Sequence, residues 1–62
     1  MTEEQMNVYK MRIAQAGIAE MTTIMLEMEI QWIRDAVVAY DGNDKEEFVR
    51  CTGKAQAVQV EL

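Results

Sequence analysis

Histidine and proline are absent from this 62-residue sequence, which contains a single cysteine, Cys51, and three glycines. Without histidine the chain lacks the commonest general base and the commonest transition-metal ligand. One cysteine cannot form an internal disulfide, and it suits a reducing compartment. We therefore expect no metal and no cofactor. The disulfides and zinc sites that usually stabilise such small domains are missing, which leaves association with other chains.

Basic residues are scarce and scattered: six Lys and Arg stand against eleven Asp and Glu, for a formal net charge of −5. Nucleic acids and anionic membrane surfaces are bound by clustered Lys and Arg, so neither partner is expected. No uninterrupted apolar run approaches the roughly 20 residues that span a bilayer. The N-terminal Met1-Thr2-Glu3-Glu4 also lacks the basic start of a signal peptide. These features predict a cytoplasmic protein.

Hydrophobic residues make up 50% of the chain, a high share for the little interior that a domain of this size can enclose. Apolar side chains that find no place in the core remain exposed and favour protein–protein contacts. A homo-oligomer is therefore expected, with a dimer favoured.

Helix-forming residues dominate the composition, and three helices are expected, at about residues 3–16, 18–40 and 45–62. Thr2 and Gln5 fit a capping box at the start of the first helix. Gly17 is expected to end or bend that helix, although without a proline it could also run on into the second.

A turn is expected between the second and third helices. Gly42 and Asn43 tolerate the left-handed conformation that ends a helix. Asp44 suits the N-cap of the third helix, where Glu46 is expected to pair with Arg50 one turn on.

Two apolar stripes run side by side along residues 18–40. The methionine–tryptophan stripe consists of Met21, Met25, Met28, Trp32, Ala36 and Ala39. The isoleucine stripe consists of Leu26, Ile30, Ile33, Val37 and Tyr40. The opposite side, expected to face water, carries Glu20, Glu27, Gln31 and Arg34. A helix that is apolar over so much of its circumference needs neighbours on two sides. The predicted fold is all-α: a helical hairpin with a short N-terminal helix, completing a four-helix bundle by dimerisation.

Signatures of catalysis are missing from the sequence. It contains no Gly-rich phosphate loop, no Gly-x-Ser-x-Gly and no Cys-x-x-Cys. Glu27 and Glu29 are close in sequence, but two residues apart on a helix they point in different directions. Cys51 is interpreted as a small core residue rather than a reactive thiol. We expect no enzyme.

From Ile24 onward, the order of residues resembles the first half of the flagellar secretion chaperone family FliS. The resemblance covers roughly residues 24–62 without a gap. It rests on Ile30, Trp32, Ile33, Ala36 and Ala39, then Asn43-Asp44 and Glu46-Glu47, and finally Lys54-Ala55-Gln56 and Glu61-Leu62. The sequence departs from the family at Gln15-Ala16-Gly17-Ile18, where members have Thr-Ala-Ser-Pro, and at Leu26-Glu27-Met28, where they have Tyr-Asp-Gly.

The resemblance implies a cytosolic export chaperone that holds the disordered C-terminal segment of flagellin as helices against its own bundle. The chain would supply about half of such a bundle, and a second copy or a further segment would complete it. The alternative is a structural homodimeric bundle with no external ligand. In either case, apolar positions at helical spacing are expected to form the face for a partner or for self-association. These positions are Tyr9, Ile13, Met21, Met25, Met28, Trp32, Ile33, Ala36, Phe48, Thr52, Ala55, Val58 and Leu62.

Overall fold

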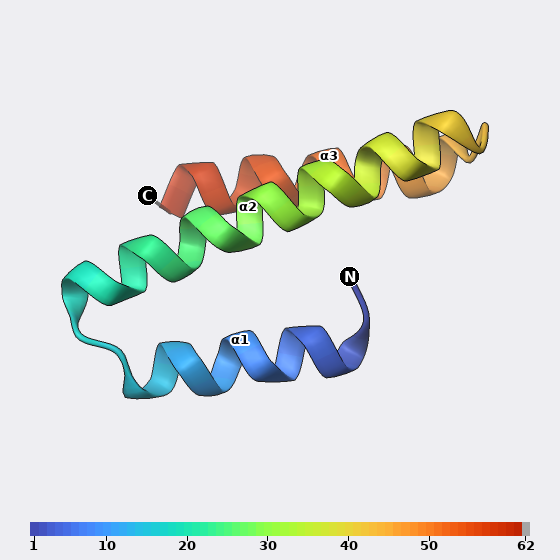
Figure 1. Cartoon of the computed structure of the whole chain (residues 1–62). Helices are drawn as coiled ribbons and strands as arrows, with labels where there is room; N and C mark the ends of the chain where they lie inside the picture. Colours follow the sequence, from blue (N-terminus) through green and yellow to red (C-terminus); the bar gives the residue numbers. More distant parts are fainter. Residues whose placement is uncertain (62) are drawn as a thin grey trace.

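Three helices form the chain in the computed structural model, which describes residues 1–61. They are α1 (Glu3–Gln15), α2 (Ile18–Asp41) and α3 (Lys45–Glu61), shown in Figure 1. No strand occurs within the described range, so the all-helical prediction is confirmed. The first two helices end within one residue of the expected positions, at about residues 16 and 40. Leu62, expected to end the third, lies outside the described residues.

The capping box at the start of α1 is confirmed. The Gln5 amide donates to Thr2 Oγ1 at 3.1 Å, and the Thr2 amide donates to Gln5 Oε1 at 2.8 Å. The helix stops because Ala16 is extended, with φ −88° and ψ 145°, and Gly17 is the N-cap of α2. The first two helices are therefore separate.

The turn between α2 and α3 depends on Asn43 and Asp44. Asn43 adopts the left-handed conformation with φ 58°, and Asp44 Oδ1 accepts a hydrogen bond from the Glu47 amide at 3.1 Å, as expected of an N-cap. Of the two residues expected to tolerate this conformation, only Asn43 adopts it, because Gly42 has φ −86° and ψ 3°. One left-handed residue is enough to reverse the chain here.

The core of the molecule lies in the antiparallel hairpin of α2 and α3. Its buried cluster consists of Trp32, Ala36, Cys51 and Ala55, with Phe48 and Val58 packed at its edges. The methionine–tryptophan stripe is thus the side of α2 that faces α3. No other helix of the described chain closely approaches Gly53, where an added Cβ would meet no atom beyond its own stretch of helix within 4 Å.

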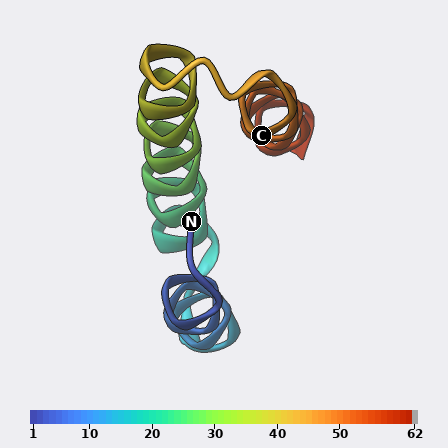
Figure 2. The ribbon, with the colours of Figure 1, turned by 90° about the vertical axis from the view of Figure 1, so that its right-hand side faces the viewer.

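α1 packs more loosely: its backbone lies close to α2 alone, and Met6 reaches the edge of the buried cluster. None of its residues 3–15 is buried, and within residues 1–61 it makes no close backbone contact with α3. Figure 2 shows α1 and α3 on different sides of α2. The Cα atoms span 39 × 23 × 12 Å, so the three helices form a flat arrangement and leave part of α2 uncovered.

The side of α2 that was expected to face water is instead partly covered by α1. Glu27 and Gln31 are half-buried, whereas Glu20 and Arg34 are exposed. The reason is an ion pair that joins the two helices, in which Arg12 Nη1 donates to Glu27 Oε2 at 2.6 Å. Because α1 covers the polar side of α2, the isoleucine stripe stays largely exposed in the described chain. Two of its members have neighbours on other helices: Ile30 shares a hollow with Tyr9, and the ring of Tyr40 lies near that of Phe48.

Candidate functional site

An apolar groove of about 450 Å³ lies between α1, α2 and α3. α2 forms its floor with Met21, Met25, Met28 and Trp32. We call it the methionine groove. Its remaining lining residues are Met6 and Ile13 from α1, and Lys54, Ala57, Val58 and Glu61 from α3. Its volume falls within the range of small-ligand pockets and admits a few apolar side chains.

Trp32 is the rigid part of this floor. Its side chain is buried, and the guanidinium carbon of Arg50 lies 5.4 Å from its ring centroid, a cation–π distance. Arg50 is held there by Glu47, with Nε donating to Oε2 at 3.1 Å and Nη2 donating to Oε1. The prediction that Glu46 pairs with Arg50 is therefore wrong. Glu47, three residues before Arg50, accepts both hydrogen bonds while the guanidinium stacks on the Trp32 indole.

Beneath this pair lies Cys51, a fully buried free thiol. Its Sγ donates to Glu47 Oε1 at 3.3 Å. Burial, and next the hydrogen bond to the Glu47 carboxylate, raise the pKa of the Cys51 thiol. Hydrogen bonds from Arg50 and then from Cys51 lower the pKa of Glu47. The thiol therefore stays protonated at neutral pH and serves packing rather than nucleophilic chemistry.

Two polar contacts hold α1 over the groove. The Arg12–Glu27 hydrogen bond lowers the pKa of the Glu27 carboxyl and raises that of the Arg12 guanidinium. At the other end of the helix, the amino group of Met1 pairs with Asp35, which also accepts from Gln31 Nε2 at 3.0 Å. One wall of the groove is thus fixed by these polar contacts together with Met1 and Met6, which are partly buried and pack against the hairpin cluster.

The predicted face divides into separate parts in the structure. The groove brings together Ile13, Met21, Met25, Met28, Trp32 and Val58. The seam between α2 and α3 buries Ala36 and Ala55 and half-buries Phe48 and Thr52. Tyr9 lies on another side of α1, where it lines a separate hollow with four residues of α2: Glu27, Ile30, Gln31 and Arg34. Ile33 is 48% exposed on the isoleucine stripe, and Leu62 lies outside the described residues.

Sequence reasoning did not include Met6, Lys54, Ala57 and Glu61 among the lining residues. Met6 could have been found, since it lies seven residues before Ile13 and so on the same side of α1. Periodicity did not identify the three α3 residues, because Lys54, Ala57 and Glu61 are exposed and lie next to, not on, the apolar face of their helix. Lys54 and Glu61 add one positive and one negative charge to the groove lining.

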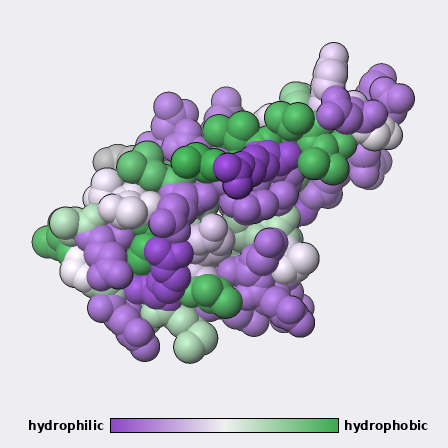
Figure 3. All heavy atoms as spheres, viewed as in Figure 1, coloured by the Kyte–Doolittle hydropathy of each residue, from purple (hydrophilic) through white to green (hydrophobic). Residues whose placement is uncertain are grey.

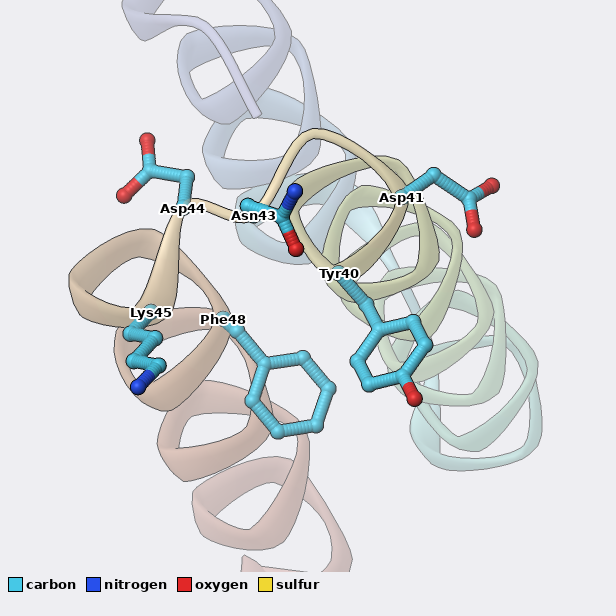
Figure 4. A pocket seen from close by; sticks show the side chains of 6 residues that line it. All are labelled: Tyr40, Asp41, Asn43, Asp44, Lys45 and Phe48. Atoms are coloured by element: carbon cyan, nitrogen blue, oxygen red, sulfur yellow. The ribbon is translucent and has the colours of Figure 1, made fainter.

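A second hollow lies at the turn between α2 and α3, and Figure 4 shows its lining from close by. The rings of Tyr40 and Phe48 lie near each other, with centroids 5.8 Å apart and planes tilted by 54°. The side chains of Asp44 and Lys45 point away from these rings (Figure 4). The aromatic pair ties the turn together at the end of the isoleucine stripe.

Within residues 1–61, no group of three or more His, Cys, Asp or Glu side chains is placed to hold a metal ion. In the same range, no helix has both the length and the apolar character to cross a membrane. The chemistry that this arrangement offers is therefore apolar contact with a few charges at the rim.

Comparison with known proteins finds no family model, no curated protein and no solved structure that matches the chain.

Proposed function

We propose that this chain is a cytoplasmic, FliS-like export chaperone that binds an amphipathic, otherwise disordered segment of another protein, with the C-terminal region of flagellin as the expected partner. The observation that carries the proposal is the methionine groove, an open apolar surface at the meeting point of three helices. The resemblance of residues 24–62 to the FliS family supports the same function.

The proposed mechanism needs no catalytic step. A partner helix places apolar side chains into the groove, where they are kept from associating with other copies of the partner. Methionine suits such a surface because its unbranched side chain adapts to partners of different shape. Lys54 and Glu61 at the lining can pair with charges on the polar side of the partner helix.

The test is a calorimetric titration of the protein with a synthetic peptide of the flagellin C-terminal region. We expect saturable binding with a negative heat-capacity change, the signature of apolar burial. Met28→Asp should weaken binding at least about tenfold, because it places a charge in the apolar floor. Val38→Asp is the matched control, since Val38 is 71% exposed and does not line the groove.

Circular dichroism of each variant verifies that the helices remain. A folded protein that gives no heat with the peptide, or a Met28→Asp variant that binds as tightly as Val38→Asp, would contradict the proposal.

A second candidate function is a structural homodimeric bundle without an external ligand. The observation that favours it is the exposed isoleucine stripe, which a second hairpin could cover to complete a four-helix bundle. A hydrophobic dye separates the two functions. A folded dimer that still binds dye has an open groove, whereas a purely structural bundle should bind none.

A further inference from the structure

The isoleucine stripe is an ordered row of exposed apolar side chains on one side of α2. Its members are Leu26, Ile30, Ile33, Val37 and Tyr40, with exposed fractions of 47%, 51%, 48%, 54% and 69%. Their spacing of four, three, four and three residues is the heptad pattern that pairs helices. Figure 3 shows apolar atoms gathered along α2 on the face turned to the viewer.

The exposed surface of the molecule is larger than its size requires. A compact monomer of 7.1 kDa exposes about 4,100 Å², whereas this chain exposes 4724 Å². The five stripe side chains together expose roughly 500 Å², so pairing two copies would bury up to about 1,000 Å², the lower bound of a specific interface.

We propose that a second copy of this chain covers the isoleucine stripe, with the two α2 helices antiparallel. They are related by a two-fold axis that crosses the helix pair on the stripe side, at the level between residues 31 and 32. In this register Ile30 packs against Ile33 of the second copy, and Leu26 packs against Val37. The spacing of these four residues reads the same in both directions along the helix, so each of the four meets another stripe residue, as two-fold symmetry requires; Tyr40 lies outside this set, opposite Thr23 of the second copy. This register deepens, and rests on, the proposed four-helix bundle.

Charge favours the antiparallel direction. The turn end of each hairpin carries Asp41, Asp44, Glu46 and Glu47. A parallel dimer would bring two such acidic ends together, whereas the antiparallel dimer places them at opposite ends and sets the helix dipoles against each other.

The flanks of the antiparallel interface contain one attractive and one repulsive pair of charges. Arg34 lies beside Glu27 of the second copy, once on each side of the axis, an attractive contact. Glu20 and Asp41 would approach each other at the outer ends, where both are exposed to water and the repulsion is small.

The proposed interface leaves the methionine groove open. The groove lies on the side of α2 that faces α1 and α3, whereas the isoleucine stripe points elsewhere on the helix. A dimer should therefore offer two grooves and bind one partner segment per chain.

The first experiment measures mass in solution by sedimentation equilibrium over a range of concentrations. The wild-type chain should reach twice 7.1 kDa, and Val38→Asp should behave like it. Ile33→Asp should weaken dimerisation at least about 100-fold, because each dimer would then bury two unpaired charges. A folded wild type that remains monomeric, or equal effects of the two substitutions, overturns the proposal.

The second experiment tests the register by disulfide cross-linking in a Cys51→Ala background. Leu26→Cys and Val37→Cys chains are mixed, oxidised mildly and weighed by mass spectrometry, with Val38→Cys as the control for random collisions. The antiparallel register predicts that Leu26→Cys links mainly to Val37→Cys. Links of either variant to itself would show a parallel dimer and overturn the register.

The peptide titration, repeated on the cross-linked dimer, keeps the two proposals apart. One peptide per chain is the expected stoichiometry. If neither the cross-linked dimer nor the monomeric Ile33→Asp variant binds peptide, the groove is refuted and the interface stands. If the monomeric variant binds peptide and the cross-linked dimer does not, the separation of the two surfaces is overturned.

Discussion

Replacing Trp32 tests whether the hairpin core is as small as the structure shows. Trp32 is only 3% exposed and contacts both the buried small residues of the seam and the guanidinium of Arg50. A buried tryptophan removes about 150–250 Å² from water. At about 25 cal/mol per Å² this corresponds to roughly 4–6 kcal/mol, an upper estimate.

A stable domain of this length has a free energy of unfolding of about 3–9 kcal/mol in total. Trp32→Ala, which typically costs about 3–5 kcal/mol, should therefore leave little or no folded hairpin. Trp32→Phe keeps a ring of smaller area and should cost about 1–2 kcal/mol. With a urea dependence near 1 kcal/mol per molar, its midpoint should fall by about 1–2 M.

The assay is urea denaturation followed by circular dichroism at one fixed protein concentration, because association shifts apparent stability. Val38→Ala is the matched control: Val38 is on the same helix but 71% exposed, and such a surface substitution usually changes stability by less than about 0.5 kcal/mol. If Trp32→Phe and Val38→Ala had the same midpoint, Trp32 could not be the centre of the core.

Two further predictions concern titratable groups. Because burial raises the pKa of the Cys51 thiol, iodoacetamide at mildly alkaline pH should alkylate the folded chain far more slowly than the urea-unfolded chain; equal rates by mass spectrometry would contradict the buried position. The lowered pKa of Glu27 means that its ion pair with Arg12 stabilises the fold above the ordinary glutamate pKa of about 4.3 and that this contribution is lost as pH falls through the lowered folded value. Glu27→Gln should therefore speed amide exchange in α1 relative to wild type at neutral pH but not in acid below that value, and a difference independent of pH would refute the role of the carboxylate.

Much of the backbone was predictable from local signals. The capping box at Thr2, the N-cap at Asp44 and the left-handed Asn43 each act within a few residues, so the sequence alone predicts them. The partner of Arg50 was not predictable. Pairing with Glu46 or with Glu47 is equally local, and what favours Glu47 is the position of Trp32 on another helix.

The methionine groove was predictable in part for the same reason. Periodicity places Met21, Met25 and Met28 on one side of α2, and they do line the groove. It does not say which sides of α1 and α3 turn toward them, so Lys54 and Glu61 were not predicted. Likewise, periodicity identified two apolar stripes on α2 but could not show that α1 would pack on the polar side and leave one stripe uncovered.

The position of α1 on the polar side of α2 would allow α2 to bind the two proposed partners at once. An intramolecular ion pair at Arg12 and Glu27 holds α1 away from the isoleucine stripe, and the same placement makes α1 a wall of the methionine groove. Occupation of either surface would stabilise the folded chain, because any ligand that binds only the folded state shifts the folding equilibrium. If the two surfaces are independent, their effects add, and a bound peptide should raise the stability of the monomer and of the dimer by the same amount.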